Sequence, residues 1–400
     1  MALVFQDPQV LSSEPGLHAF IVGVSLYPHL PNGGGAQATN SFGLKQLTST
    51  ALSAYRMYEW LLKNRALLPR KLATVHLLVS PSPKERGLEP GFAALGDIRA
   101  TRDAFGVDAE QWRERARASN DGFALFYFAG HGLARKKGDT VLLCEDFAKP
   151  GSGGVLNKAV DHDHLFNGMS PRKRIGEAIA RRQVYFVDAC RTDLPTAGQI
   201  EEPRVPDLWE IELGGTDNRE APIFFATIPG AEAMALDGVQ TLFSQAMLAC
   251  LDHDALRPLD ELDANGNPRY GATAYQLEAA LKPYLVTLND KHRTTQQHTM
   301  GGRVSNITLR YAEGPPAVSV VVDVEPAADA ASVVYRVEDA QGQGIYDLSP
   351  VNATPFSHEL PAGTYKFSAS VPNPQPPYER FAIFGQVMPP SYPVKARVRQ

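Results

Sequence analysis

The sequence predicts an α/β protein with a mostly parallel sheet flanked by helices, followed by a small all-β sandwich. Short apolar runs, typical of strands buried on both faces, alternate with amphipathic helical patterns from residue 17 to residue 285. After Pro315-Pro316, short β-type segments are separated by Gly, Pro, Asn and Asp, with no helical pattern between them. We therefore expect two domains, residues 1–312 and residues 313–400.

The opening elements of the first domain follow from hydrophobic patterning. An apolar run at Leu17–Tyr27 predicts a buried strand that leaves through a Pro/Asn/Gly-rich loop. Apolar residues at three-to-four spacing from Leu44 to Leu62 predict a core-facing helix, and Leu72–Val79 predicts a second strand. Thr101 is a predicted N-cap of the next helix.

The later elements are predicted in the same way. Buried strands are expected at Phe123–Phe128, Val184–Val187 and Ile223–Ile228, with helices from Ile175 to Arg182 and from Leu242 to Leu251. The second domain is expected to be an antiparallel sandwich. Its predicted strands are Val318–Val324, Ser332–Val337, Phe356–Leu360 and Thr364–Val371.

The composition excludes several classes of protein. A net charge of −5 argues against a dedicated nucleic-acid binder, which usually carries a basic domain or stripe. No leader pattern opens the chain and no 18-residue apolar run occurs, so no membrane association is expected. The 3 cysteines form no CxxC pair, so a disulfide framework is not expected and a reducing cytoplasm fits best.

The residues most capable of catalysis lie at the ends of two predicted strands. His131 lies between Gly130 and Gly132 directly after one predicted strand, and Cys190 lies directly after another. Sites in open parallel sheets form at the carboxyl ends of strands, where loops converge. A thiol needs a neighbouring base because the thiolate is the nucleophile, so we expect His131 and Cys190 to act as a pair.

These motifs resemble those of the caspase-like peptidases, the group of caspases, metacaspases and their bacterial relatives. The caspase signature is Gln-Ala-Cys with a His about 50 residues upstream. Here the run is Asp188-Ala189-Cys190-Arg191-Thr192, and His131 lies 59 residues before Cys190. The resemblance extends over about residues 15–285, including the strands HAFIVGVSLY and IFFATIPGAEA.

The resemblance implies a cysteine endopeptidase that acts on protein or peptide substrates. Cys190 would attack the scissile carbonyl, His131 would protonate the leaving amine, and the backbone N–H groups of Gly132 and Cys190 would form the oxyanion hole. It also implies a dyad with no cofactor, a monomer as in metacaspases, and a role in regulated or defence-related proteolysis. An upstream activating protease or regulator is an expected partner.

Asp188 carries the prediction of substrate preference. Caspases have Gln two residues before the nucleophile, whereas metacaspases have Asp, which faces an incoming Arg or Lys. A carboxylate pairs bidentately with guanidinium, so we expect cleavage after Arg in preference to Lys. This chain departs from metacaspases at Ser49-Thr50, where their Asn-Asp pair falls. In the alternative interpretation, Asp188 only caps its loop by bonding nearby amides.

Activation is expected in the loop after the nucleophile. The stretch Thr192–Glu220 contains Gly and Pro, which are typical of exposed segments that proteases cleave. Arg204 and Arg219 fall within it and Arg191 directly precedes it, so each is a candidate processing position for an enzyme that cuts after Arg.

Other functions were weighed against this one. The main alternative is a catalytically inactive caspase-fold scaffold or binding protein. An α/β hydrolase or nucleotide binder would need G-x-S-x-G or a phosphate-binding Gly loop, and neither occurs. Asp161–His164 has no partner at a known ligand spacing, so we interpret it as an exposed loop rather than a metal site. Cys144 and Cys250 lie in apolar stretches and are expected in the core.

Overall fold

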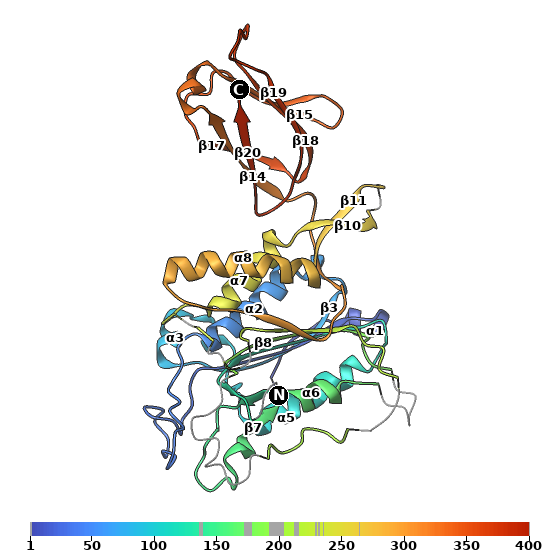
Figure 1. Cartoon of the computed structure of the whole chain (residues 1–400). Helices are drawn as coiled ribbons and strands as arrows, with labels where there is room; N and C mark the ends of the chain where they lie inside the picture. The colour runs from blue at the N-terminus through green and yellow to red at the C-terminus, as the bar shows by residue number, and fades with distance from the viewer. Residues whose placement is uncertain are drawn as a thin grey trace. The chain divides into compact units, whose positions relative to one another are not determined.

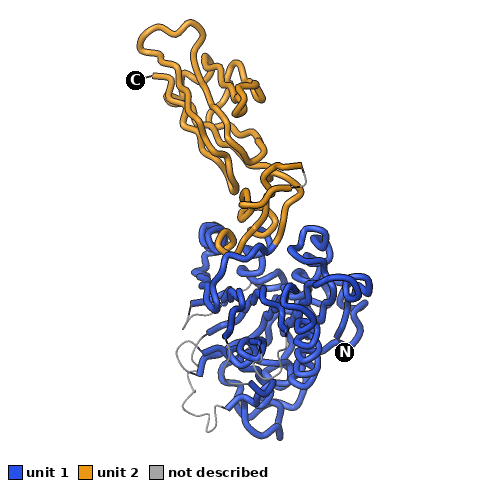
Figure 2. Tube along the Cα trace, turned by 90° about the vertical axis from the view of Figure 1, so that its right-hand side faces the viewer, with its two compact units in different colours: residues 1–249, 278–309 blue, residues 250–277, 310–400 orange. Residues whose placement is uncertain are grey.

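The structure is a computed structural model that describes residues 2–135, 139–171, 178–191, 204–211, 216–228, 230, 233–234, 236–263 and 265–399. The chain divides into two compact units (Figure 2), residues 1–249 with 278–309 and residues 250–277 with 310–400. The candidate site lies in the first unit. That residues 1–312 and 313–400 form separate domains stays a prediction.

A seven-stranded sheet forms the centre of the first unit, in the order β1-β3-β2-β4-β8-β9-β12. The inner strands β3, β2, β4, β8 and β9 run parallel, and the edge strands β1 and β12 run antiparallel to their neighbours. The predicted mostly parallel sheet is thus confirmed. The strands are β1 Leu3–Gln6, β2 Leu17–Val24, β3 Leu72–Ser80, β4 Phe123–Gly130, β8 Arg182–Ala189, β9 Ala221–Phe225 and β12 Thr299–Arg303.

Helices cover both faces of this sheet (Figure 1). Helices α2 (Thr50–Lys63), α7 (Leu242–Ala249) and α8 (Ala274–His292) lie on one face, and α5 (Arg102–Ala116) and α6 (His162–Gly168) lie on the other. A small sheet of β5 (Gly132–Leu133), β6 (Val141–Leu143) and β7 (Ala159–Asp161) continues from the end of β4. Shorter helices are α1 Pro8–Ser13, α3 Pro83–Leu88 and α4 Gly91–Ala94.

Aromatic packing joins α5 to the sheet. Phe20 meets Phe105 edge to face with ring centroids 4.9 Å apart, and Trp112 packs against Phe126 and Tyr185. The indole N–H of Trp112 donates to the carbonyl of His18 at 3.0 Å, which satisfies the buried ring nitrogen. This face of the sheet is therefore largely aromatic, and it also contains the buried pair of His76 on β3 and Asp108 on α5, with Nδ1 and Oδ1 2.8 Å apart.

Two predicted helices differ from the structure. Helix α2 begins at Thr50 rather than at Leu44, because Gln46 holds the preceding loop to the end of β2. The Gln46 amide accepts from the Tyr27 N–H and donates to the Tyr27 carbonyl, both at 2.8 Å. The helix expected from Ile175 to Arg182 is not seen over residues 178–182, where β8 begins at Arg182, and residues 175–177 lie outside the described part of the chain. Thr101 is confirmed as an N-cap, since its side chain accepts from the Ala104 N–H.

The second unit contains the expected sandwich, with one correction. Its two sheets have the orders β17-β14-β20 and β16-β15-β18-β19, and a third sheet joins β10, β11 and β13. The sandwich is not wholly antiparallel, because β14 and β20 pair in parallel. Parallel pairing needs a long connection, and the rest of the sandwich lies between these two strands. The strands are β10 Arg257–Leu262, β11 Pro268–Thr273, β13 Thr308–Tyr311, β14 Ala317–Glu325, β15 Val334–Asp339, β16 Gly344–Leu348, β17 Phe356–Pro361, β18 Gly363–Ser370, β19 Phe381–Val387 and β20 Ser391–Arg397.

Gly23 permits the close contact between β2 and α2 and gives a test of this packing. A Cβ atom on Gly23 would lie 2.5 Å from the Ala54 Cβ and 2.9 Å from the Ala51 Cα. Gly23→Ala should therefore lower the free energy of unfolding by about 1–3 kcal/mol in denaturant titrations. Gly87→Ala is the matched control, because Gly87 lies in α3 with no atom within 4 Å of the added methyl. Equal stability of both variants would contradict this packing.

Candidate functional site

The sheet register brings the two predicted catalytic residues to neighbouring positions. Strands β4 and β8 pair in parallel, with Gly130 opposite Ala189, so His131 and Cys190 are the next residues on adjacent strands. A Cβ atom on Gly132 would lie 2.5 Å from the Cys190 carbonyl oxygen. The two loops are therefore in direct backbone contact, which only glycine permits at this point.

The His131 imidazole is buried, with 8% of its surface exposed. Its Nε2 lies 2.6 Å from the carbonyl oxygen of Lys45. Because a carbonyl only accepts, Nε2 carries the proton and Nδ1 is the basic nitrogen. Burial lowers the pKa of His131, and the Lys45 carbonyl opposes this effect by favouring the protonated ring. The ring is thus neutral near pH 7, as a proton acceptor requires.

Tyr27 fixes the backbone of His131. Its hydroxyl accepts from the His131 N–H at 2.8 Å, and the ring centroids lie 4.9 Å apart. The Tyr27 side chain is fully buried, and its hydroxyl donates to the Leu143 carbonyl at 3.4 Å. Sequence reasoning missed both Tyr27 and the Lys45 carbonyl. A backbone carbonyl has no sequence signature, and Tyr27 looked only like the end of a strand.

Cys190 lies beside the residues that follow β9. The Ala233 N–H donates to its Sγ at 3.2 Å, and the Gly230 N–H donates to the Arg191 carbonyl at 2.9 Å. The Thr227 hydroxyl donates to the Ala189 carbonyl at 3.3 Å. Three consecutive residues around the candidate nucleophile are thus bonded to Thr227, Gly230 and Ala233, which follow β9 in the chain.

The other two cysteines behave as core residues, as the sequence predicted. Cys144 and Cys250 are fully buried, and burial raises the pKa of both thiols. Cys190 is partly exposed. Of the three cysteines, Cys190 is therefore the one whose thiol reagents and substrates can reach.

Asp188 lies on the α2 and α7 face with 2% of its surface exposed. It accepts hydrogen bonds from the Thr241 hydroxyl and from the Tyr127 hydroxyl, the latter at 3.3 Å. Burial raises the pKa of Asp188 to about 7, and these two hydroxyls oppose the rise. The bonds to hydroxyls differ from the amide capping considered as an alternative for this residue.

The Ser49-Thr50 position provides no second acid near Asp188. The Ser49 hydroxyl donates to the Leu236 carbonyl at 2.6 Å, and the Thr50 hydroxyl donates to the Val24 carbonyl at 2.6 Å. Ser53 and Thr241 are also buried here, with hydroxyl oxygens 3.3 Å apart. The surroundings of Asp188 are thus rich in neutral hydroxyls.

Arg191, the residue after the candidate nucleophile, has 6% of its surface exposed. Its guanidinium lies over the Phe225 ring, 4.1 Å from the centroid. A buried cation on an aromatic face is held in one orientation. Arg191 therefore anchors the chain where it leaves Cys190.

The interpretation of Asp161–His164 as an exposed loop is wrong. Asp161 is the N-cap of α6, where it accepts from the His164 N–H at 2.9 Å, and it pairs with Arg135. His162 is fully buried, with its ring stacked on Phe166. Capping explains the acidic residue at Asp161, and packing on Phe166 explains the burial of His162. Within the described residues, no group of three or more His, Cys, Asp or Glu side chains could hold a metal ion.

Comparison with known families agrees with this geometry. The family model described as the caspase domain matches residues 91–265, a range that includes His131, Asp188 and Cys190. The chain has a caspase-like peptidase fold. The match to a caspase domain supports a hydrolase of the cysteine-peptidase type. The strand ends described above are the part of this caspase-like unit that carries the candidate chemistry.

Individual proteins similar to parts of this chain were also found. An uncharacterized protein of Sinorhizobium fredii, y4kE, is 25% identical over 224 residues, which cover 54% of this chain and 59% of that relative. The chain thus matches about three fifths of the relative's length. Caspase-1 from Spodoptera frugiperda has a TM-score of 0.37 and 14% identity, over 73% of this chain and 88% of that chain. Protein GSU0716 from Geobacter sulfurreducens has a TM-score of 0.40 and 10% identity, over 73% and 95%.

Among the described residues, no helix combines the length and the apolar character that crossing a membrane requires.

Asp188 predicts a pH dependence of stability. Its pKa is about 7 when folded against 3.8 as the reference, so between these values the folded state holds a proton that the unfolded state releases. The wild-type free energy of unfolding should therefore fall as pH rises from about 4 to about 7 relative to Asp188→Asn, and then stay level. Urea titrations of both proteins across this range measure the difference. Parallel pH profiles would show that the carboxyl ionises normally.

Proposed function

We propose that this protein is a cysteine endopeptidase in which Cys190 is the nucleophile and His131 the proton carrier. The observation that carries the proposal is the position of both residues directly after adjacent parallel strands, β4 and β8. The neutral imidazole, with its proton on Nε2, leaves Nδ1 as the group that can take the thiol proton.

The proposed reaction uses both residues twice. His131 Nδ1 takes the Cys190 proton, the thiolate attacks the scissile carbonyl, and the backbone N–H groups of Gly132 and Cys190 bind the oxyanion. The imidazolium then gives its proton to the leaving amine, and the C–N bond breaks to leave a thioester. Water hydrolyses the thioester, with His131 again as the base. The Lys45 carbonyl would stabilise the imidazolium through its bond to Nε2.

We infer that Asp188 selects basic residues, with Arg preferred over Lys. Its carboxyl is enclosed by the hydroxyls of Thr241 and Tyr127, which are neutral and can give way to stronger charged donors. An incoming guanidinium would pair with the ionised carboxylate and lower its pKa. Acidic side chains would be rejected by like charge.

Activation by cleavage in the loop after the nucleophile is also proposed. The burial of the candidate arginines reduces the number of positions at which a protease could cut. Arg191 and Arg219 are buried, with 6% and 4% of their surfaces exposed. Arg219 is also bonded to Asp217 at 2.7 Å. Arg204 is exposed. It is therefore the best candidate for processing, by this enzyme or by an upstream protease, in regulated or defence-related proteolysis.

Substitution of the nucleophile tests the activity itself. Wild type should release fluorophore from peptides ending in Arg, and Cys190→Ala should abolish release because no other described cysteine is accessible. Cys250→Ala is the control that removes a buried thiol. Equal hydrolysis by wild type and Cys190→Ala would reject Cys190, and an inert but folded wild type would favour the scaffold alternative.

Substitution of Asp188 tests the substrate preference. Asp188→Asn keeps the hydroxyl bonds but removes the charge, so kcat/KM for Arg and Lys peptides should fall about a hundredfold, as expected for loss of a buried ion pair. Wild-type kcat/KM for these peptides should rise as pH passes through about 7, where the carboxyl ionises. An unchanged preference for Arg in Asp188→Asn would show that another group selects the substrate.

A further inference from the structure

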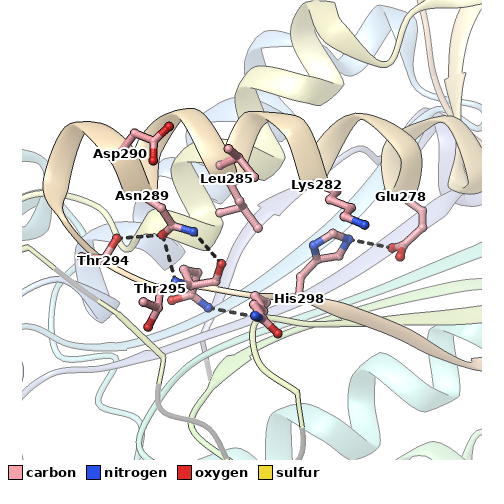
Figure 3. A pocket seen from close by; sticks show the side chains of 11 residues that line it. Glu278, Lys282, Leu285, Asn289, Asp290, Thr294, Thr295 and His298 are labelled. Carbon is pink, nitrogen blue, oxygen red and sulfur yellow. Dashed lines mark hydrogen bonds and ion pairs between the residues drawn. The ribbon is translucent and has the colours of Figure 1, made fainter.

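A pocket of about 660 Å³ lies between α8 and the segment Thr294–His298. Figure 3 shows Lys282, Glu278 and His298 at one end and Asn289 with Thr294 at the other. Gln296 forms part of its wall, but its side chain is directed away from solvent, with 2% of the residue's surface exposed. A buried amide must find hydrogen-bond partners, and those partners reveal its role.

The Gln296 side chain bonds to both ends of the segment beside Cys190. Its Nε2 donates to the Ala226 carbonyl, and its Oε1 accepts from the Met234 N–H at 2.5 Å. The Ala233 N–H, one residue before Met234, donates to the Cys190 Sγ at 3.2 Å. One side chain therefore sets the position of the backbone donor that faces the sulfur.

Asn289 on α8 holds Gln296 in place. The Gln296 N–H donates to Asn289 Oδ1, and Asn289 Nδ2 donates to the Gln296 carbonyl, both at 2.9 Å. Thr294 donates to the same Asn289 oxygen at 2.8 Å, as Figure 3 shows. The N–H and carbonyl groups of Gln296 are thus both bonded to Asn289 of α8. The Gln296 side chain therefore starts from a fixed backbone when it bonds Ala226 and Met234.

We propose that Gln296 is a positioning residue that holds the Ala233 N–H against Cys190 and so stabilises the thiolate. A hydrogen bond to the charged form of an acid favours ionisation, which makes the thiol reactive at a lower pH. The inference rests on the proposed function for Cys190 as the reacting thiol. Its test measures the sulfur directly and needs no peptidase activity.

The test is the rate of Cys190 alkylation by iodoacetamide as a function of pH, with the labelled residue identified by mass spectrometry. Gln296→Met keeps the side-chain length but loses both hydrogen bonds. Its alkylation midpoint should rise by about one pH unit, which slows labelling about tenfold at neutral pH. The control is Gln297→Ala, since Gln297 is an exposed neighbour in the same pocket wall. Buried Cys144 and Cys250 should stay unlabelled in all folded proteins.

A second variant separates the positioning residue from the donor. Ala233→Pro removes the N–H that faces the sulfur and should shift the midpoint in the same direction. A shift in Ala233→Pro without one in Gln296→Met would overturn the role of Gln296. If circular dichroism shows Gln296→Met unfolded, Gln296→Leu replaces it, because its uncharged side chain also loses both hydrogen bonds. A wild-type midpoint in that folded variant would also overturn the proposal. If the alkylation midpoint shifts in Gln296→Met but the wild-type protein has no peptidase activity, the role of Gln296 stands and only the proposed function is refuted.

Discussion

The parallel register of β4 and β8 is the constraint on which the rest of the site depends. Parallel strands end at the same edge of a sheet, so any residues directly after two neighbouring strands must lie close together. Here those residues are His131 and Cys190. The lack of a side chain at Gly132 lets the two loops touch, because a Cβ there would lie 2.5 Å from the Cys190 carbonyl oxygen.

The two faces of the sheet differ in the side chains that they bury. The α5 face is filled by aromatic rings and also holds the buried His76–Asp108 pair. The α2 and α7 face contains the buried hydroxyls around Asp188. A carboxyl in such a place is costly when ionised, which is why its pKa is raised to about 7. A fold retains such a group most readily where a charged partner binds, and this supports the proposed preference for basic side chains.

Much of the fold could be predicted from the sequence, because buried parallel strands are continuous apolar runs with clear ends. The runs before His131 and before Cys190 became β4 and β8, and Thr101 was confirmed as a cap. Positions set by tertiary contacts could not be predicted in this way. Helix α2 starts late because Gln46 bonds the Tyr27 backbone, and α6 forms where a polar cluster looked like a loop.

The candidate site was predictable only as far as its side chains carry a pattern. His131 and Cys190 follow strands and could be found, but Tyr27 and Gln296 act through backbone groups of residues far away in the sequence. Tyr27 accepts from the His131 N–H, and Gln296 accepts from the Met234 N–H beside the sulfur's donor. The backbone of the proposed proton carrier is therefore held by Tyr27, and the N–H group that faces the proposed nucleophile lies one residue before the N–H that bonds Gln296; both are buried polar side chains from other parts of the chain. Because each of these contacts is made to the main chain, a side chain substituted at His131 or Cys190 would leave the positioning intact, and the geometry of the site is a property of the fold.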